Sequence, residues 1–156
     1  MHKAVQFDIA EQYGYGIEVF VIGTKGSGRL DLYDGTCNAY YEVKHQPAAS
    51  GISFENQMDK YDNSFVTGWR FAEYSLTGNV VRGEEYISGR TTYLYWDIRY
   101  WTAEDGVIVY RWQVNKSRYS QYMSTLVIAA GAMALSYLKG RLDGAPQGLD
   151  RHTLNY

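Results

Sequence analysis

The sequence predicts a single α+β domain that spans residues 1–156. A chain of 156 residues has the length of one ordinary domain. Its hydrophobic residues, 46% of the total, are enough for a packed core and too many for a disordered chain. Segments with helical spacing of apolar residues and segments with strict apolar–polar alternation follow one another as helix, three strands, helix, several strands, helix. This mixed order is typical of an α+β fold.

The amino-terminal third predicts one helix and three strands. Residues 3–13 carry apolar side chains at helical spacing, and the following "GYG" ends the helix. Residues 17–23, "IEVFVIG", are β-branched and apolar, which predicts a strand buried on both faces. The alternating segments 29–34 and 39–45 flank a turn that contains Gly35, so we expect an antiparallel hairpin.

The middle of the chain predicts a second helix and then a run of strands. In residues 53–64, "SFENQMDKYDNS", the side chains of Phe54, Met58 and Tyr61 lie on one helical stripe. From Trp69 onward the pattern changes to period two, which predicts antiparallel strands joined by tight turns. The predicted strands are "WRFAEYSL", "VVRGEEYIS", "RTTYLYWDIRYW" and "GVIVYRWQV".

A last helix is predicted from about Lys116 to Leu142. It contains the apolar run "MSTLVIAAGAMALSYL", residues 123–138, which is shorter than the roughly 20 residues that a membrane-spanning helix needs. The run also contains serine, threonine, glycine and tyrosine. We therefore interpret it as a buried helix of the domain and expect no membrane anchoring.

Charge and cysteine content exclude several classes of protein. A formal net charge of −2 argues against extended, salt-driven coating of nucleic acid. One cysteine excludes a disulfide framework, and no histidine–cysteine spacing suits zinc. The second half is modestly basic, so its strand arginines either line a local anion groove or face solvent; these are Arg82, Arg90, Arg99 and Arg111.

The predicted hairpin carries an unusual group of charges. If a four-residue loop, Gly35–Asn38, joins the strands, Asp31 lies directly opposite Glu42, and two facing carboxylates destabilise a sheet unless a cation lies between them. Lys44 is two residues beyond Glu42 and shares its face. A Mg²⁺ or Mn²⁺ ion between the carboxylates would account for the arrangement. Solvated edge residues held by ordinary ion pairs are the alternative, and a shorter turn would change the register.

These residues resemble a known family of nucleases. Asp31 followed by "EVK" at 42–44 resembles the PD-(D/E)XK nuclease superfamily, and "GRLD" is similar to the Gly-Arg-Pro-Asp stretch of many members, with Leu30 where proline often stands. The helix 53–64 resembles the next element in nuclease domains of bacterial polymorphic toxins, with Gln57 and Tyr61 in the matching places. The resemblance covers about residues 4–65.

The resemblance implies both a fold and a set of catalytic residues. The fold would be a restriction-endonuclease-like mixed sheet flanked by helices, followed here by an antiparallel strand-rich second half. The activity would be that of a metal-dependent phosphodiesterase, in which Asp31 and Glu42, with the carbonyl of Val43, bind Mg²⁺ or Mn²⁺. Lys44 would orient or polarise the attacking water and help to neutralise the charge that develops on the phosphorus group.

The resemblance also implies two further site residues. Gln57 would hold a water molecule or a phosphate oxygen. In many members the first helix supplies another acidic metal ligand. Glu11, at the end of the predicted first helix, is the best match, and Glu18 is the competing candidate.

The biological role implied by the resemblance is that of a toxin used between bacteria. We expect an endonuclease, acting on DNA more than on RNA, that is secreted or delivered into the cytoplasm of a target cell and neutralised by a cognate immunity protein. A housekeeping or phage nuclease would perform the same reaction. A non-catalytic, aromatic-rich binding or immunity module, in which the charged cluster is structural, is the alternative from another functional class.

Overall fold

The structure is a computed structural model that describes residues 1–46, 52–62, 64–66 and 79–143. The chain divides into one compact unit, Met1–Asn115, and a second unit that begins at Lys116. Helices occupy α1 (His2–Tyr13), α2 (Ile52–Tyr61) and α3 (Lys116–Asp143). The strands are β1 (Gly16–Gly23), β2 (Gly26–Asp34), β3 (Ala39–His45), β4 (Phe65–Val66), β5 (Val81–Arg82), β6 (Ser88–Tyr93), β7 (Trp96–Glu104) and β8 (Val107–Val114).

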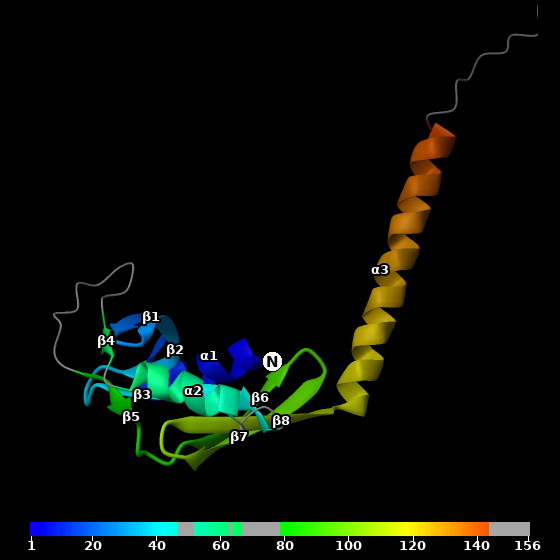
Figure 1. The fold of residues 1–156 in the computed structure, drawn as a ribbon. Helices are drawn as coiled ribbons and strands as arrows, with labels where there is room; N and C mark the ends of the chain where they lie inside the picture. Colours follow the sequence, from blue (N-terminus) through cyan, green and yellow to red (C-terminus); the bar gives the residue numbers. More distant parts are fainter. Residues whose placement is uncertain (47–51, 63, 67–78, 144–156) are drawn as a thin grey trace, which may run out of the picture. The chain divides into compact units, whose positions relative to one another are not determined.

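One mixed sheet forms the centre of the unit Met1–Asn115 (Figure 1). Its strand order is β4-β1-β2-β3-β8-β7-β6, and the short β5 pairs with β3. All pairs along this order are antiparallel except β3 with β8, which is parallel. The predicted α+β class, with helices packed on a mixed sheet, is confirmed. The prediction of a single domain over residues 1–156 stays a prediction.

Two hydrophobic cores lie on opposite faces of this sheet. One contains Phe54 and Met58 of α2 together with Tyr40. The other contains Val5 of α1 together with Tyr41. Because successive side chains of a strand point to opposite faces, these neighbouring tyrosines of β3 place α1 and α2 on opposite sides. The helical stripe predicted for α2 is confirmed as its buried face.

The register predicted for the hairpin is confirmed where the two strands pair. Leu32 faces Tyr41 and Asp34 faces Ala39, so a four-residue loop joins β2 and β3. Asn38, the last residue of that loop, has a φ of 61°, a left-handed conformation that asparagine adopts more readily than most residues. From Glu42 onward β3 pairs instead with β8, beginning with Glu42 opposite Val107. The prediction that Asp31 lies directly opposite Glu42 in the hairpin is therefore wrong, because the β2–β3 ladder ends at the Leu32–Tyr41 pair.

Several strand predictions are corrected by the structure. Strand β1 is not buried on both faces, because Phe20 and Ile22 are 39% and 49% exposed. The segment 90–101 is not one strand: β6 and β7 form a hairpin around Leu94, which has a φ of 55°. Only the ends of the segment 80–88 are extended, in β5 and at the first residue of β6. The segment "WRFAEYSL" lies outside the described residues.

The last helix forms as predicted and begins the second unit of the chain; the prediction that its apolar run is buried against the rest of the domain stays a prediction. Every residue of α3 from Lys116 to Gly140 is exposed. The 18-residue window that makes this helix a candidate membrane span has a mean hydropathy of 1.3 and none of its residues buried. Within its own unit the apolar run packs against no other described element.

Candidate functional site

The candidate site lies where the ladder between β2 and β3 ends. Beyond the Leu32–Tyr41 pair, β3 continues on β8, and the backbone N–H of Glu42 donates to the carbonyl of Gly106 at 2.8 Å. The next backbone N–H, that of Val43, donates to the Asp31 carboxylate at 2.8 Å. A side chain thus satisfies a backbone donor at the point where the hairpin opens. Asp31 is held at this position by the local change of strand partner.

The strands that carry Asp31 and Glu18 also change face at these residues. Leu30 belongs to the core beside α2, whereas Leu32 belongs to the core beside α1. Two residues apart in a regular strand would share a face. The facing strand β1 changes in the same way around Glu18, which has a φ of 53°. A non-glycine residue in this left-handed region stores strain of about 1–3 kcal/mol, a feature that is frequent at functional sites.

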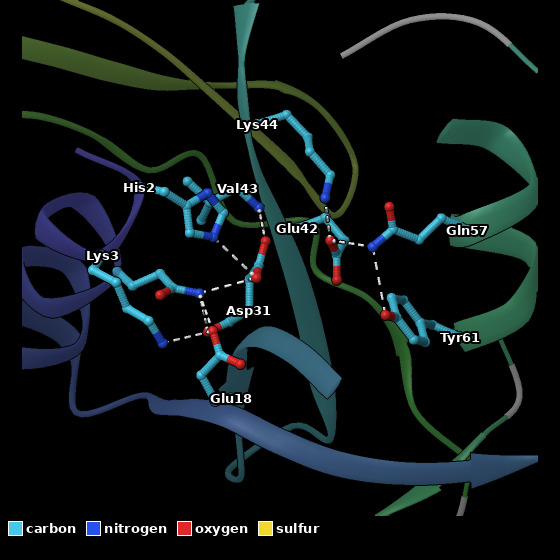
Figure 2. Close-up of polar contacts among 10 residues, drawn as sticks. His2, Lys3, Glu18, Asp31, Glu42, Val43, Lys44, Gln57 and Tyr61 are labelled. Carbon is cyan, nitrogen blue, oxygen red and sulfur yellow. Dashed lines mark hydrogen bonds and ion pairs between the residues drawn. The ribbon is translucent and has the colours of Figure 1, made fainter. Parts of the chain in front are cut away.

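On the α1 side, Asp31 and Glu18 share donors from the first two turns of the helix (Figure 2). Gln6 Nε2 lies 3.0 Å from Asp31 Oδ1 and 3.2 Å from Glu18 Oε1. His2 Nε2 lies 3.1 Å from Asp31 Oδ1, and this contact is an ion pair only when the imidazole is protonated. Lys3 Nζ donates to Glu18 at 2.8 Å. The result is a hydrogen-bonded network that contains its own cation.

This network offers metal-binding atoms that are already occupied. Ligand atoms of His2, Glu18 and Asp31 all lie within 4.8 Å of one another. Lys3 and Gln6, however, already donate into the same space and compensate the carboxylates. The α1 side is therefore better described as an ion-pair network than as the first choice for a metal ion.

On the α2 side, Glu42 is the central group (Figure 2). Its side chain is 1% exposed, and its Oε2 accepts from Lys44 Nζ at 3.1 Å and from Gln57 Nε2 at 3.0 Å. Gln57 Nε2 also lies 3.4 Å from the hydroxyl of Tyr61, four residues along α2. The other oxygen, Oε1, is buried and has no hydrogen-bond partner among the described residues. A buried carboxylate oxygen without a donor is costly unless a cation or a proton meets it.

The pKa values of Asp31 and Glu42 shift in opposite directions. Burial, and then the charge of Asp31, raise the pKa of Glu42 to about 8, although Lys44 opposes the rise. Burial would also raise the pKa of Asp31, but hydrogen bonds from His2 and Val43 and the charges of His2 and Lys44 lower it overall. The pKa of Lys44 is raised because Glu42 outweighs the effect of burial. The lowered pKa keeps Asp31 ionised at neutral pH, whereas the raised pKa favours the protonated form of Glu42.

These residues fit a divalent cation. The orphaned Glu42 Oε1 and the charge of Asp31 supply oxygen ligands, which Mg²⁺ and Mn²⁺ prefer. Both Asp31 oxygens already accept hydrogen bonds, but each carboxylate oxygen has a second lone pair. A cation placed here would displace the proton from Glu42 and relieve its repulsion with Asp31.

The structure brings together most of the residues that the sequence singled out. Glu42, Lys44 and Gln57 are in direct contact, and the charge of Asp31 acts on both Glu42 and Lys44. Glu11 is different: it is exposed near the end of α1. Glu18, the competing candidate for the extra acidic ligand, is the one that lies beside Asp31.

Three residues of the site were missed from the sequence. They are His2, Lys3 and Gln6, all in the first two turns of α1. A usable sequence signal existed for Gln6, because it lies between Val5 and Ile9 on the apolar stripe of the helix. The structure buries it completely there. A polar residue on the apolar stripe of a helix indicates a buried partner.

Comparisons with known proteins leave the family open. No protein-family model matches the chain, and no curated protein or solved structure is significantly similar to it. The resemblance to PD-(D/E)XK nucleases therefore rests on the motif residues and stays a prediction.

Proposed function

We propose that the chain is a metal-dependent phosphodiesterase that cuts nucleic acid. The observation that carries the proposal is the state of Glu42. It is a completely buried carboxyl group with a pKa raised to about 8, next to an ionised aspartate and a lysine, and one of its oxygens has no partner in the described part of the chain. A buried carboxyl group with so raised a pKa costs stability at neutral pH, and such shifts are frequent at functional sites, so Glu42 is a candidate functional group.

The roles of the residues follow from their contacts. Asp31 and Glu42 would hold Mg²⁺ or Mn²⁺, and the ion, when bound, activates water and polarises the phosphate. Lys44 stays protonated at neutral pH because its pKa is raised, so it acts as a fixed positive charge that stabilises the negative charge developing on the phosphate. Gln57 holds the Glu42 carboxylate in place and connects it to Tyr61.

The substrate and the biological setting are proposed from the motif resemblance. DNA is the first substrate to test and RNA the second. The proposed setting is a toxin delivered into the cytoplasm of a competing bacterium and held inactive in the producing cell by an immunity protein. A housekeeping or phage nuclease would use the same site for the same reaction.

A non-catalytic role is favoured by one specific observation. Both oxygens of Asp31 already accept hydrogen bonds from protein donors, and one of these secures the backbone of Val43 where β3 leaves β2. In that case Asp31 only holds β3 to β2 through the backbone of Val43, and the chain is a binding or immunity module. This candidate predicts that metal ions have no effect on the protein.

The experiment that separates the two functions is a cleavage assay on the purified full chain. Plasmid DNA and tRNA are each incubated with the protein in Mg²⁺, in Mn²⁺ and in excess chelator. Cleavage that requires the metal supports the phosphodiesterase. Intact substrates in every condition, together with harmless expression in bacteria, would favour the binding module.

A further inference from the structure

Three arginines form a row across the strands β6, β7 and β8. Arg90 lies directly opposite Arg99, and Arg99 lies directly opposite Arg111. All three are exposed. Cross-strand neighbours have Cβ atoms about 5 Å apart, and like charges in such pairs destabilise a sheet. None of the three forms an ion pair with a carboxylate among the described residues. The carboxylate of Asp97 borders this arginine row on the same part of the sheet, without an ion pair to any of the three arginines among the described residues.

The arginine row lies beside the candidate site on the same face of the sheet. Lys44 is paired with Val109 of β8, and Arg111 is two residues beyond Val109. Alternation therefore places Arg111 on the face of Lys44, one step of about 6.6 Å farther along the strands. Val109 and Trp101 of this face pack in the core beside α2.

The surroundings of the row suit an extended anion. The Arg111 guanidinium carbon lies 5.6 Å from the centre of the Trp101 ring, which orients the side chain by a cation–π contact. A hollow beside the row is lined by Arg99, Arg111 and Gln113. Asp97 also borders this hollow, and its carboxylate accepts a hydrogen bond from Asn115 at 3.1 Å.

We propose that the arginine row binds the phosphate backbone of a nucleic acid that extends from Lys44 across β8, β7 and β6. Guanidinium groups bind phosphates through paired hydrogen bonds, and such contacts fix register without reading sequence. The position of the cleaved phosphate at Lys44 rests on the proposed function. Binding by the row does not, because it needs no metal and no cleavage.

The test is duplex DNA binding in the presence of chelator, measured at several salt concentrations by fluorescence anisotropy. Arg99→Ala should make the plot of log affinity against log salt shallower by about 0.9, the value for one lost phosphate contact. Arg99→Lys should keep most of the slope. Arg29→Ala is the matched control, because Arg29 is exposed on β2 and precedes Leu30, which faces α2, so it points to the opposite face.

The outcomes separate this proposal from the proposed function. A shallower slope for Arg99→Ala and an unchanged slope for Arg29→Ala support the row, even if the protein never cleaves. The proposal for the arginine row would be overturned if the two variants gave equal slopes of log affinity against log salt. It would also be overturned if the parent chain bound no duplex DNA. Metal-dependent cleavage combined with equal slopes would support the proposed function and reject the binding of phosphates by the arginine row.

A different observation concerns α3, which has the properties of a helix made for lipid. The 20 residues from Tyr119 to Leu138 contain no Asp, Glu, Lys or Arg. At 1.5 Å per residue they span about 30 Å, the thickness of a bilayer's hydrocarbon core. Six large apolar side chains in this stretch are between 45% and 72% exposed: Leu126, Val127, Ile128, Met133, Leu135 and Leu138.

Two hydroxyl groups of this stretch are bonded in a way that suits a lipid environment. Ser124 Oγ donates to the Ser120 carbonyl at 2.9 Å, and Thr125 Oγ1 donates to the Gln121 carbonyl at 3.0 Å. Hydroxyls that bond to their own helix need no water, which is a condition for burial in hydrocarbon. The helix itself already satisfies these two groups.

The ends of the stretch match the two membrane interfaces. Tyr119 and Tyr122 lie near one end and Tyr137 lies near the other, as in the aromatic belts of membrane proteins. Basic residues flank the stretch on both sides, at Lys116 and Lys139 among others. At 3.6 residues per turn the large apolar side chains point in directions that cover most of the circumference, whereas a helix lying on a membrane surface has one apolar face.

We infer that α3 spans a lipid bilayer. The glycines of the helix supply a matched pair of variants, because a side chain added at Gly131 or at Gly140 meets no other atom within 4 Å. Gly131→Arg puts a charge inside the uncharged stretch, and Gly140→Arg puts the same charge just outside it. The parent chain and Gly140→Arg should remain in bacterial membranes after an alkaline carbonate wash. Gly131→Arg should be lost from that fraction.

A second measurement distinguishes spanning from surface binding. Cys37 is the one cysteine of the chain and is exposed in the β2–β3 loop. A Cys37→Ala, Thr153→Cys variant moves the thiol beyond α3. In sealed vesicles a membrane-impermeant maleimide should label only one of these two positions, and both after detergent. Labelling of both in sealed vesicles, a soluble parent chain, or identical fractionation of the two arginine variants would overturn the inference.

Discussion

Replacing Glu42 with glutamine should stabilise the metal-free protein, and increasingly so as the pH rises. Glutamine has nearly the same shape and removes the buried charge. Burial and Asp31 raise the pKa of Glu42 from 4.5 to about 8. The folded state therefore keeps a proton that the unfolded state releases over this range. The free energy of unfolding falls as the pH rises from about 4.5 to about 8, and the glutamine variant lacks this dependence.

The size of the effect follows from the shift in pKa. Each pKa unit corresponds to 1.36 kcal/mol. At pH 7, about 2.5 units above the unfolded pKa, the glutamate costs about 3 kcal/mol, and above pH 8 it costs about 5 kcal/mol. The pKa of about 8 already includes the opposing effect of Lys44. Part of the gain is offset because the glutamine Nε2 becomes a buried donor in the place of Oε1, which has no partner among the described residues. We expect a net stabilisation of about 2 kcal/mol at pH 7 and almost none at pH 4.5.

The assay is urea unfolding in chelator at pH 5, 7 and 8.5, followed by tryptophan fluorescence. Glu104→Gln is the control, because Glu104 is exposed at the end of β7. A difference between the Glu42 variant and the parent chain that grows with pH, absent for the control, agrees with the reasoning. A Glu42→Gln variant less stable than the parent chain at pH 8.5 would refute it.

The remaining predictions concern the carboxylates around Glu42 and the metal ion. Asp31→Asn should lower the free energy of unfolding at neutral pH. The pKa of Asp31 is lower in the folded state than in the unfolded state, so the ionised aspartate stabilises the fold at neutral pH and loses this effect on acidification. Unfolding of the variant and the parent chain at pH 7 and pH 3 measures the difference. In the same variant the pKa of Glu42 should fall, which NMR titration of its side chain would detect. Mg²⁺ should raise the melting temperature more at pH 8.5 than at pH 6, because binding must displace the Glu42 proton; an equal response would argue against a metal at this site. Glu18→Gln should change the response to Mg²⁺, whereas Glu11→Gln should not, and the reverse result would restore Glu11 as the ligand.

The parts of the site that the sequence predicted depend on local patterns. The four-residue loop and the alternation of β2 and β3 predicted the register from Leu32–Tyr41 to Asp34–Ala39. Gln57 and Tyr61 were paired only by the motif resemblance, and they are in contact across four residues of α2. Alternation along β3 predicted that Glu42 and Lys44 share a face, and they are in contact. The position of Gln57 beside them was predicted only from the motif resemblance.

The parts that it did not predict depend on long-range pairing. Nothing local to β3 indicates that its second half pairs in parallel with β8, more than 60 residues later in the chain. That pairing opens the hairpin at Asp31. Asp31 and Glu42 are therefore not a cross-strand pair, as predicted, but lie on either side of the point where β3 leaves β2. The contribution of α1 was hidden for the same reason, because His2 and Gln6 reach Asp31 only through the packing of α1 on the sheet.

Two further misses have local causes. Leu94 adopts a left-handed conformation that leucine rarely takes, so the turn between β6 and β7 carries no glycine or asparagine signal and the two strands read as one. The apolar run of α3 predicts burial but does not distinguish a protein core from a lipid bilayer, because both select the same side chains. The proposal for α3 takes the second medium, because the run is exposed within its own unit.

The most direct test of the central claim is the rate of metal-dependent DNA cleavage by Lys44→Ala and Glu42→Gln, each compared with the parent chain and with Glu104→Gln. Circular dichroism first establishes that every variant is folded. The account predicts that both site variants lose cleavage by at least about a hundredfold, because they remove the fixed positive charge and a metal ligand, while Glu104→Gln cleaves at the parental rate. Cleavage at the parental rate by folded Lys44→Ala or Glu42→Gln would contradict it.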